Sequence, residues 1–264
     1  MSILRIADVS KHFGGVSALS HVTLTVSPGE VYGLIGPNGA GKTTLFNLIN
    51  GIYPVSAGHV LVGDEDVTNW RPDAIARVGV ARTFQSIHLF AGMSVLENVL
   101  MGQSRFAYTG LRSLLPVLAD RREAALAREA LDTLAFLGLA AYAALPAHDL
   151  PYAVQRKVEI ARALASRPRL LLLDEPAAGC NDEESRELSA DIRRIRDLGI
   201  TIVLIEHDMS VVMDVCGRIA VLNFGERIAE GSPAEIQSNP AVVEAYLGRE
   251  DSDAPTPARR ELVG

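Results

Sequence analysis

The pattern of apolar and polar residues changes along the chain. Residues 3–9 and 16–26 alternate between the two kinds, as half-buried strands do. Residues 169–173 and 200–205 instead form nearly continuous apolar runs bounded by polar residues. Runs of this kind are typical of strands buried on both faces of a parallel sheet. The pattern therefore predicts two sorts of strand, an alternating kind near the N-terminus and a buried kind further on.

Helices are predicted between these strands. They are expected at residues 44–49, at residues 72–78, from Ser94 onward, across residues 114–137 and at residues 182–198. Ser94 and Glu97 have the spacing of a capping box, and Gly199 closes the last helix. Strands that alternate with helices in this way favour an α/β fold.

The organisation indicates one α/β domain over residues 1–248. It carries an antiparallel β arm near its N-terminus and an inserted helical subdomain around residues 86–166. Residues 249–264 are predicted to be a disordered tail, because acidic residues and prolines dominate the start of this segment.

A glycine-rich loop follows the apolar run at residues 31–35. Residues 36–43 match the phosphate-loop pattern G-x-x-x-x-G-K-[ST] at every required position. The glycines allow backbone N–H groups to surround phosphate oxygens, and the following helix N-terminus adds partial positive charge. Lys42 is expected to reach the β- and γ-phosphates, and Thr43 to offer its hydroxyl to Mg²⁺. The residues predicted to contact the nucleotide are Gly36, Pro37, Asn38, Gly39, Ala40, Gly41, Lys42, Thr43 and Thr44.

Polar residues follow the buried strands. Asp174 and Glu175 come directly after one apolar run, and ligands of open α/β sheets bind beyond the carboxyl ends of such strands. Asp174 is therefore placed to hold Mg²⁺, and Glu175 to polarise the attacking water. His207 follows the next run and could donate to a γ-phosphate, while Gln85 could touch Mg²⁺ or the water. Taken alone, His207 would be a surface histidine and Gln85 a polar loop residue.

Composition narrows the class of protein. A net charge of −7 over 264 residues argues against a dedicated nucleic-acid binder. The two cysteines, Cys180 and Cys216, indicate a reducing compartment without a disulfide framework. No signal peptide and no apolar run of membrane-spanning length is visible, so we expect a cytosolic chain that meets a membrane through a partner.

The order of phosphate loop, Gln85, Asp174-Glu175 and His207 resembles the ATP-binding subunit of ABC transporters, across roughly residues 3–248. The resemblance implies a P-loop NTPase core, two chains that sandwich two ATP molecules, and a membrane permease driven by closure and hydrolysis. It implies that Glu175 is the general base, that Lys42, Mg²⁺ and His207 neutralise charge on the γ-phosphoryl group, and that Thr43, Gln85 and Asp174 face the metal. Phe13 would stack on adenine; the alternative is a core phenylalanine between two strands.

Several segments are similar to the ATPases of branched-chain amino-acid importers. They are residues 79–90, 93–99, 205–209 and 221–231. The implied partners are permease subunits, a second ATPase or a second copy of this chain, and indirectly a periplasmic binding protein, at the cytoplasmic face of the plasma membrane. Residues 86–110 are expected to receive a short permease helix. For Phe90 in that segment, packing inside the helical subdomain is an equal alternative.

Other transport systems stay open. ATPases for urea, short amides or aromatic acids look alike, and a lipopolysaccharide-export ATPase shares the fold. A soluble ABC ATPase acting on DNA or ribosomes usually has a coiled-coil insertion or two tandem cassettes, and this chain has neither. A GTPase should show an Asn-Lys-x-Asp motif on a late strand, whereas Ile205 leads into Glu206-His207-Asp208.

The largest departure from the family lies at Leu150–Val154. The family's signature reads Leu-Ser-Gly-Gly-Gln, in the branched-chain subfamily often Leu-Ser-Tyr-Gly, and here it reads Leu-Pro-Tyr-Ala-Val. The resemblance implies that the serine and the glycine amides cap the γ-phosphate of ATP bound to the partner chain. Pro151 has neither a hydroxyl nor an N–H, and Ala153 adds a methyl group where a glycine is usual. We therefore expect the ATP site completed by this signature to be the slower one, unless Pro151 simply occupies a tolerant first helical turn.

Overall fold

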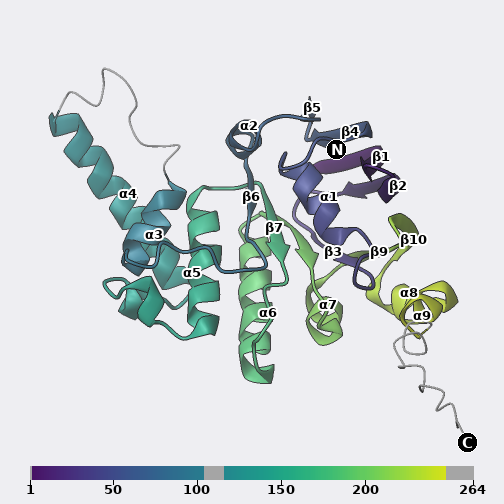
Figure 1. The fold of residues 1–264 in the computed structure, drawn as a ribbon. Coiled ribbons are helices and arrows are strands. Elements are labelled where there is room, and N and C mark those ends of the chain that lie inside the picture. The colour runs from purple at the N-terminus through teal and green to yellow at the C-terminus, as the bar shows by residue number, and fades with distance from the viewer. Residues whose placement is uncertain (1, 104–115, 248–264) are drawn as a thin grey trace, which may run out of the picture.

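The computed structural model describes residues 2–103 and 116–247, and their strands form two sheets with helices beside them (Figure 1). The smaller sheet is antiparallel and has the order β2-β1-β4-β5. Its strands are β1 (Leu4–Phe13), β2 (Val16–Val26), β4 (Ala57–Val62) and β5 (Glu65–Asp66). The predicted β arm is therefore present, and its inner strands are β1 and β4.

The larger sheet has the order β10-β9-β3-β8-β7-β6. Its strands are β3 (Val31–Ile35), β6 (Val80–Arg82), β7 (Leu170–Asp174), β8 (Thr201–Ile205), β9 (Arg218–Asn223) and β10 (Glu226–Gly231). All neighbouring pairs are parallel except β9 with β10. Every residue of β3, β7 and β8 is buried, which confirms the prediction from the continuous apolar runs.

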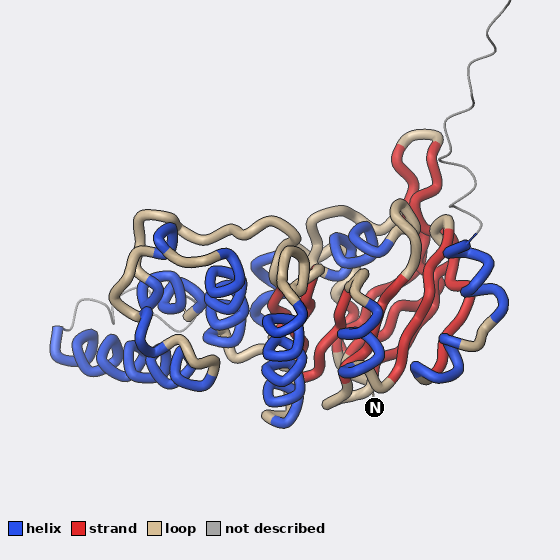
Figure 2. Tube along the Cα trace, turned by 90° about the horizontal axis from the view of Figure 1, so that it is seen from below, coloured by secondary structure: helices blue, strands red, loops and turns tan. Residues whose placement is uncertain are grey.

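Helices cover both faces of the larger sheet. They are α1 (Lys42–Ile49), α2 (Pro72–Arg77), α3 (Val95–Gly102), α4 (Pro116–Phe136), α5 (Tyr152–Ala165), α6 (Asp182–Asp197), α7 (Met209–Val215), α8 (Pro233–Gln237) and α9 (Pro240–Leu247), with 3₁₀ turns at Ala140–Tyr142 and Ala147–Asp149. Helices α3, α4 and α5 contact one another, and this group of helices lies at the opposite end from the strands of the two sheets (Figure 2). They lie within the predicted helical subdomain, whose limits of 86–166 remain a prediction. The predicted disordered tail at 249–264 lies outside the described residues.

Strand β3 divides the buried side chains into two cores. Val31 and Ile35 join the core that contains helices α5, α6 and α7. Tyr32 and Leu34 face the other core, beside α1 and the β arm. The sheet is therefore buried on both faces, and its polar chemistry is confined to the strand ends.

Strand β1 continues past the predicted end at Val9, as far as Phe13. The ladder with β2 has irregular register at three places beyond Ile6, and Asp8 has a positive φ of 54°. These bulges break the strict alternation, so that Ser10 and Lys11 are both buried. A pattern search for period two ends where such a bulge begins, which explains the shorter prediction.

Candidate active site

The phosphate loop connects β3 to α1 and leaves no room for larger residues at Gly36 and Gly41. Gly36 has φ 148°, and a Cβ atom there would lie 2.0 Å from the backbone oxygen of Leu222. Gly41 has φ 103°, and its Cβ would lie 2.8 Å from the oxygen of Ala18. The loop is thus fitted against β9 and β2 by positions that only glycine can occupy.

Lys42 lies at the first position of α1 and is 5% exposed. Its ammonium donates to the backbone oxygens of Gly36 at 2.7 Å and Pro37 at 3.0 Å. These bonds hold the cation inside the curve of its own loop, where the glycine N–H groups and the α1 N-terminus are also placed to meet an anion.

A cavity of about 520 Å³ opens over this loop. Its lining consists of Val16, Ser17, Ala18, Asn38, Gly39, Ala40, Gly41, Lys42, Thr43, Thr44, Gln85, Glu175, His207 and Phe224. The structure therefore brings seven consecutive residues of the predicted phosphate site together with Gln85, Glu175 and His207.

Glu175 is held between two side chains that are distant in sequence. One carboxylate oxygen accepts from the Gln85 side-chain amide at 2.8 Å, and the other lies 2.7 Å from Nε2 of His207. The Glu175 backbone has a positive φ of 49°, and its N–H donates to the oxygen of Ile205 on β8. A non-glycine residue in this region is costly, and such strain is concentrated at functional sites.

Asp174 has a different environment from its neighbour. Its side chain is 2% exposed and pairs with Arg82 at 2.8 Å, and Arg82 also donates to Asn47 on α1 at 2.7 Å. Burial raises the pKa of the Asp174 carboxyl, and the Arg82 guanidinium partly offsets that rise. Oδ1 of Asp174 is buried and has no hydrogen-bond partner among the described residues. An acceptor left open in this way suits a water ligand of Mg²⁺, so the donor set fits the metal that the sequence predicts.

The chain has clear relatives among known proteins. Residues 19–178 match the family described as ABC transporter, which is more than half of the sequence. The chain is an ATP-binding subunit of the ABC transporter family. The high-affinity branched-chain amino acid transport ATP-binding protein LivG of Escherichia coli K12 is 44% identical over 252 residues, which are 93% of this chain and 98% of LivG. Residues 226–252 also match the family described as branched-chain amino acid ATP-binding cassette transporter.

Solved structures agree with the fold of this ABC subunit. The ADP conformation of an ATP-binding cassette has a TM-score of 0.83 at 34% identity, covering 94% of this chain and 99% of that one. A dimeric bacterial ABC transporter cassette has a TM-score of 0.74 at 26% identity, with coverage of 87% and 98%. The prediction of an ABC ATPase, whose hydrolysis is coupled to transport, is confirmed. None of the described helices has the length and apolar character needed to cross a bilayer.

Phe13 lies at the end of β1 and outside the set of residues that line the cavity. Its ring meets Tyr53 edge-on with 5.2 Å between centroids, and the Lys11 ammonium lies 4.7 Å from its centre. The apolar residues that do line the cavity include Val16 and Phe224, and Phe224 is 82% exposed. Adenine stacking by Phe13 stays a prediction.

The signature segment begins at the exposed N-terminus of α5. Pro151 is the N-cap residue and supplies no side-chain hydrogen bond, and Tyr152 is 47% exposed. Asn181 caps α6 by accepting from the backbone N–H groups of Glu183 and Glu184. Asparagine is among the residues preferred at this position of a helix.

Glu206 is a residue of the site that sequence reasoning did not single out. It is 3% exposed and accepts from three backbone N–H groups, those of Ala177, His207 and Asp208. Burial raises the pKa of this carboxyl, while the three donors act in the opposite direction. Glu206 thus ties the loop after β7 to the loop after β8. An acid directly after a buried strand was the available signal.

Proposed function

We propose that this ABC subunit binds ATP and Mg²⁺ in the phosphate-loop cavity and that Glu175 is the general base for hydrolysis. The observation that carries the proposal is the carboxylate of Glu175, held between Gln85 and His207 on the wall of that cavity. Both carboxylate oxygens are engaged by side chains from other elements, so the group is oriented before substrate arrives.

The two adjacent acids take separate roles because their surroundings differ. Asp174 is buried and paired with Arg82, whereas Glu175 borders the cavity. Thr43, Gln85 and Asp174 would hold Mg²⁺, directly or through water. When bound, the metal neutralises charge on the transferred phosphoryl group. Lys42 and His207 would add positive charge and hydrogen bonds on the cavity wall, where they stabilise the γ-phosphate during cleavage.

The sharpest test of the site is Glu175→Gln. The amide keeps the shape of the side chain but cannot take a proton, so ATP turnover should fall about a hundredfold or more while ATP affinity is kept. The matched control is Glu65→Gln, an exposed glutamate on the β arm. Turnover by Glu175→Gln equal to that of the control would show that Glu175 is not the base.

We propose further that the subunit energises an importer for branched-chain amino acids. The likeness to LivG and the match at residues 226–252 support this solute class. The partners would be permease subunits and a second ATPase or a second copy of this chain, with a periplasmic binding protein acting indirectly. The chain would lie peripherally on the cytoplasmic face of the plasma membrane.

The permease would dock beside the loop after β6. Phe90 is 47% exposed and Met93 36% exposed in this segment, and Met101 on α3 is 43% exposed. Exposed apolar side chains in this part of the chain suit contact with a short apolar helix from a partner. The predicted docking segment of residues 86–110 also includes Phe106 and Tyr108, which lie outside the described residues.

Transport by the reconstituted complex tests the solute. Vesicles that contain the permease subunits, both ATPases and the binding protein should accumulate leucine, isoleucine or valine when ATP is enclosed. The same vesicles loaded with Glu175→Gln should accumulate about a hundredfold less. Uptake of urea or short amides in place of the amino acids would assign the subunit to the related system instead.

A further inference from the structure

Helix α5 carries three charged residues on one face. Arg156, Glu159 and Arg162 are spaced three residues apart, which places them along the same side of the helix. Arg156 is 2% exposed and Glu159 is 1% exposed, and the two form an ion pair at 3.3 Å. Charges buried to this degree are retained only where they are paired and hydrogen-bonded.

These three side chains hold the backbone of the loop that contains Gln85. Arg156 donates to the carbonyl oxygens of Phe84 at 2.7 Å and Gln85 at 2.6 Å. Glu159 accepts from the N–H of His88, and Arg162 donates to the oxygen of the same residue. We call Arg156, Glu159 and Arg162 the loop clasp.

The loop clasp is connected through Gln85 to Glu175, the proposed base. Gln85, whose backbone oxygen receives Arg156, directs its side-chain amide to Glu175 at 2.8 Å. Arg156 itself is absent from the lining of the nucleotide cavity. It also donates to the hydroxyl of Tyr152 at 2.8 Å, in the signature segment. A single buried guanidinium therefore connects the signature segment to the residue that orients Glu175.

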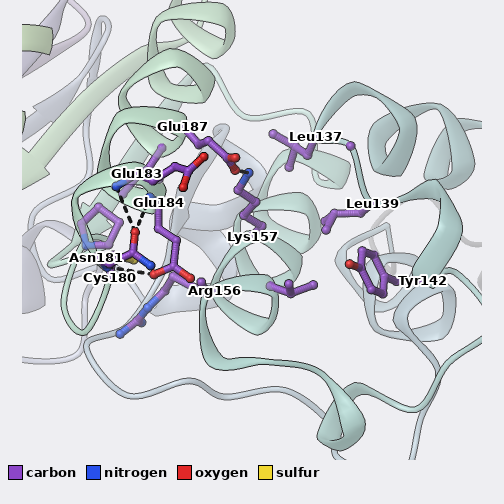
Figure 3. Close-up of a pocket in the computed structure, with 15 residues that line it drawn as sticks. Leu137, Leu139, Tyr142, Arg156, Lys157, Cys180, Asn181, Glu183, Glu184 and Glu187 are labelled. Carbon is purple, nitrogen blue, oxygen red and sulfur yellow. Dashed lines mark hydrogen bonds and ion pairs between the residues drawn. The ribbon is translucent and has the colours of Figure 1, made fainter.

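The adjacent Lys157 shows that this connection is specific to one face of α5. Its ammonium pairs with Glu187 at 2.9 Å and Asp191 at 3.3 Å, both on α6. Figure 3 shows the two side chains leaving the helix in different directions, Lys157 toward Glu187 and Arg156 away from it. Lys157 is therefore a natural control, since it is a cation on the same helix without contact to the loop.

We infer that Arg156 is a positioning residue for ATP hydrolysis, which acts by holding the backbone at Phe84 and Gln85 so that the Gln85 amide meets Glu175. The inference rests on the proposed role of Glu175. The planar guanidinium of arginine suits the holding of this backbone, because its N–H donors can reach two carbonyl oxygens at once. A lysine ammonium on its flexible side chain does this less well.

The first arm of the test is hydrogen–deuterium exchange of the full chain without nucleotide. In Arg156→Gln, the amides of residues 84–90 should exchange about tenfold faster, while those of α1 keep their wild-type rates. Arg156→Gln leaves the Glu159 carboxylate with a weaker partner, so Arg156→Gln/Glu159→Gln is a second variant without the unpaired charge. Exchange at residues 84–90 that is unchanged in both variants would overturn the inference.

The second arm is a double-mutant cycle on ATP turnover. Arg156→Gln should lower kcat by about tenfold with ATP affinity kept, and Arg156→Lys should recover part of the loss. In a Gln85→Ala background, Arg156→Gln should lower kcat by about twofold or less, because the Gln85 side chain through which Arg156 acts is already absent. Lys157→Gln should have equal effects in both backgrounds. Additive effects of Arg156→Gln and Gln85→Ala would also overturn the inference.

The two arms separate this inference from the proposed function. If Glu175→Gln hydrolyses ATP normally while loop exchange rises in Arg156→Gln, the clasp orders the loop but the assignment of the base is wrong. If Glu175→Gln is inactive and loop exchange is unchanged, the base stands and the positioning role of Arg156 is refuted.

Discussion

Helices α1 and α5 both begin without a side-chain cap, and their surroundings differ sharply. The N-terminus of α1 follows Gly41 and is enclosed by the glycine loop, with Lys42 buried beside it. The N-terminus of α5 follows Pro151 and lies at the exposed start of the signature segment. An uncapped helix start offers unpaired N–H groups to an anion. The phosphate loop with the start of α1 forms the complete cradle predicted for phosphate, whereas the start of α5 forms the incomplete one, without the serine hydroxyl and the glycine expected from the family's signature.

Three other helices begin with a side-chain cap. Ser94, Asn181 and Ser232 close α3, α6 and α8 with full capping boxes, in which a glutamate also returns to the N-cap backbone. A capping box satisfies some of the N–H groups at the helix start with the helix's own side chains, so fewer donors are left for a phosphate. An uncapped start alone does not mark a ligand position, because α2 also begins without a side-chain cap at Arg71. The residues around the helix start decide whether it can bind an anion.

The largest expected effect comes from filling the complete cradle. Gly36→Ala places a Cβ 2.0 Å from the oxygen of Leu222 at φ 148°, so the loop must move away from β9. We expect a loss of stability on the order of 3 kcal/mol together with loss of ATP binding. Calorimetric unfolding and nucleotide titration measure the two. Gly217→Ala is the control, because a Cβ at that glycine meets nothing within 4 Å; equal behaviour of the two variants would refute the fitted cradle.

A smaller effect is expected from repairing the incomplete cradle. Pro151→Ser, Ala153→Gly and Val154→Gln together return a hydroxyl, an N–H and room for the backbone at the start of α5. One hydrogen bond to a charged group contributes about 1.5–3 kcal/mol, so the rate at the site completed by this signature should rise about ten- to a hundredfold. Steady-state ATPase activity of the assembled transporter, measured once with Glu175 inactivated and once with the partner's base inactivated, separates the two sites.

An unchanged rate in the repaired variant would mean that the degenerate signature is neutral. In that case Pro151 occupies a tolerant helix start, and the remaining amides of α5 suffice for the partner's ATP. The comparison between α1 and α5 would then describe local geometry without an effect on the rate.

The smallest expected effect concerns the closed helix starts. The pKa of Glu97 lies below its usual value because the backbone N–H and the hydroxyl of Ser94 donate to it, and Ser232 does the same for Glu235. A lowered pKa in the folded state means that this stabilisation is present above the ordinary glutamate range and is lost as the pH falls through the lowered pKa. Glu97→Gln/Glu235→Gln should therefore melt slightly below wild type at neutral pH, and the gap should close on acidification.

Thermal unfolding across that pH range checks the effect, with Glu65→Gln on the β arm as the control. A gap between wild type and Glu97→Gln/Glu235→Gln that widens toward acid pH would contradict the assigned sign.

Local sequence was enough to predict the phosphate loop and the strands that end at the acidic residues. The phosphate loop is contiguous, and its glycines, lysine and following helix are recognisable without any distant contact. The apolar runs before Asp174 and His207 likewise predict strands whose ends must meet at one edge of a parallel sheet. The family resemblance followed from the order of these short segments along the chain.

The tertiary structure alone decided which groups meet. Gln85 and Glu175 are 90 residues apart, and Arg82 and Asp174 are 92 apart. Phe13 meets Tyr53, which is 40 positions further along the chain, beyond a stretch of β1 with irregular register that no local pattern records. In the sequence Arg156 is one polar residue of the signature region, and only the fold places its guanidinium against the carbonyls of Phe84 and Gln85. Periodicity identifies which face of a helix is buried, whereas the partner of a buried charge depends on chain segments that only folding brings together.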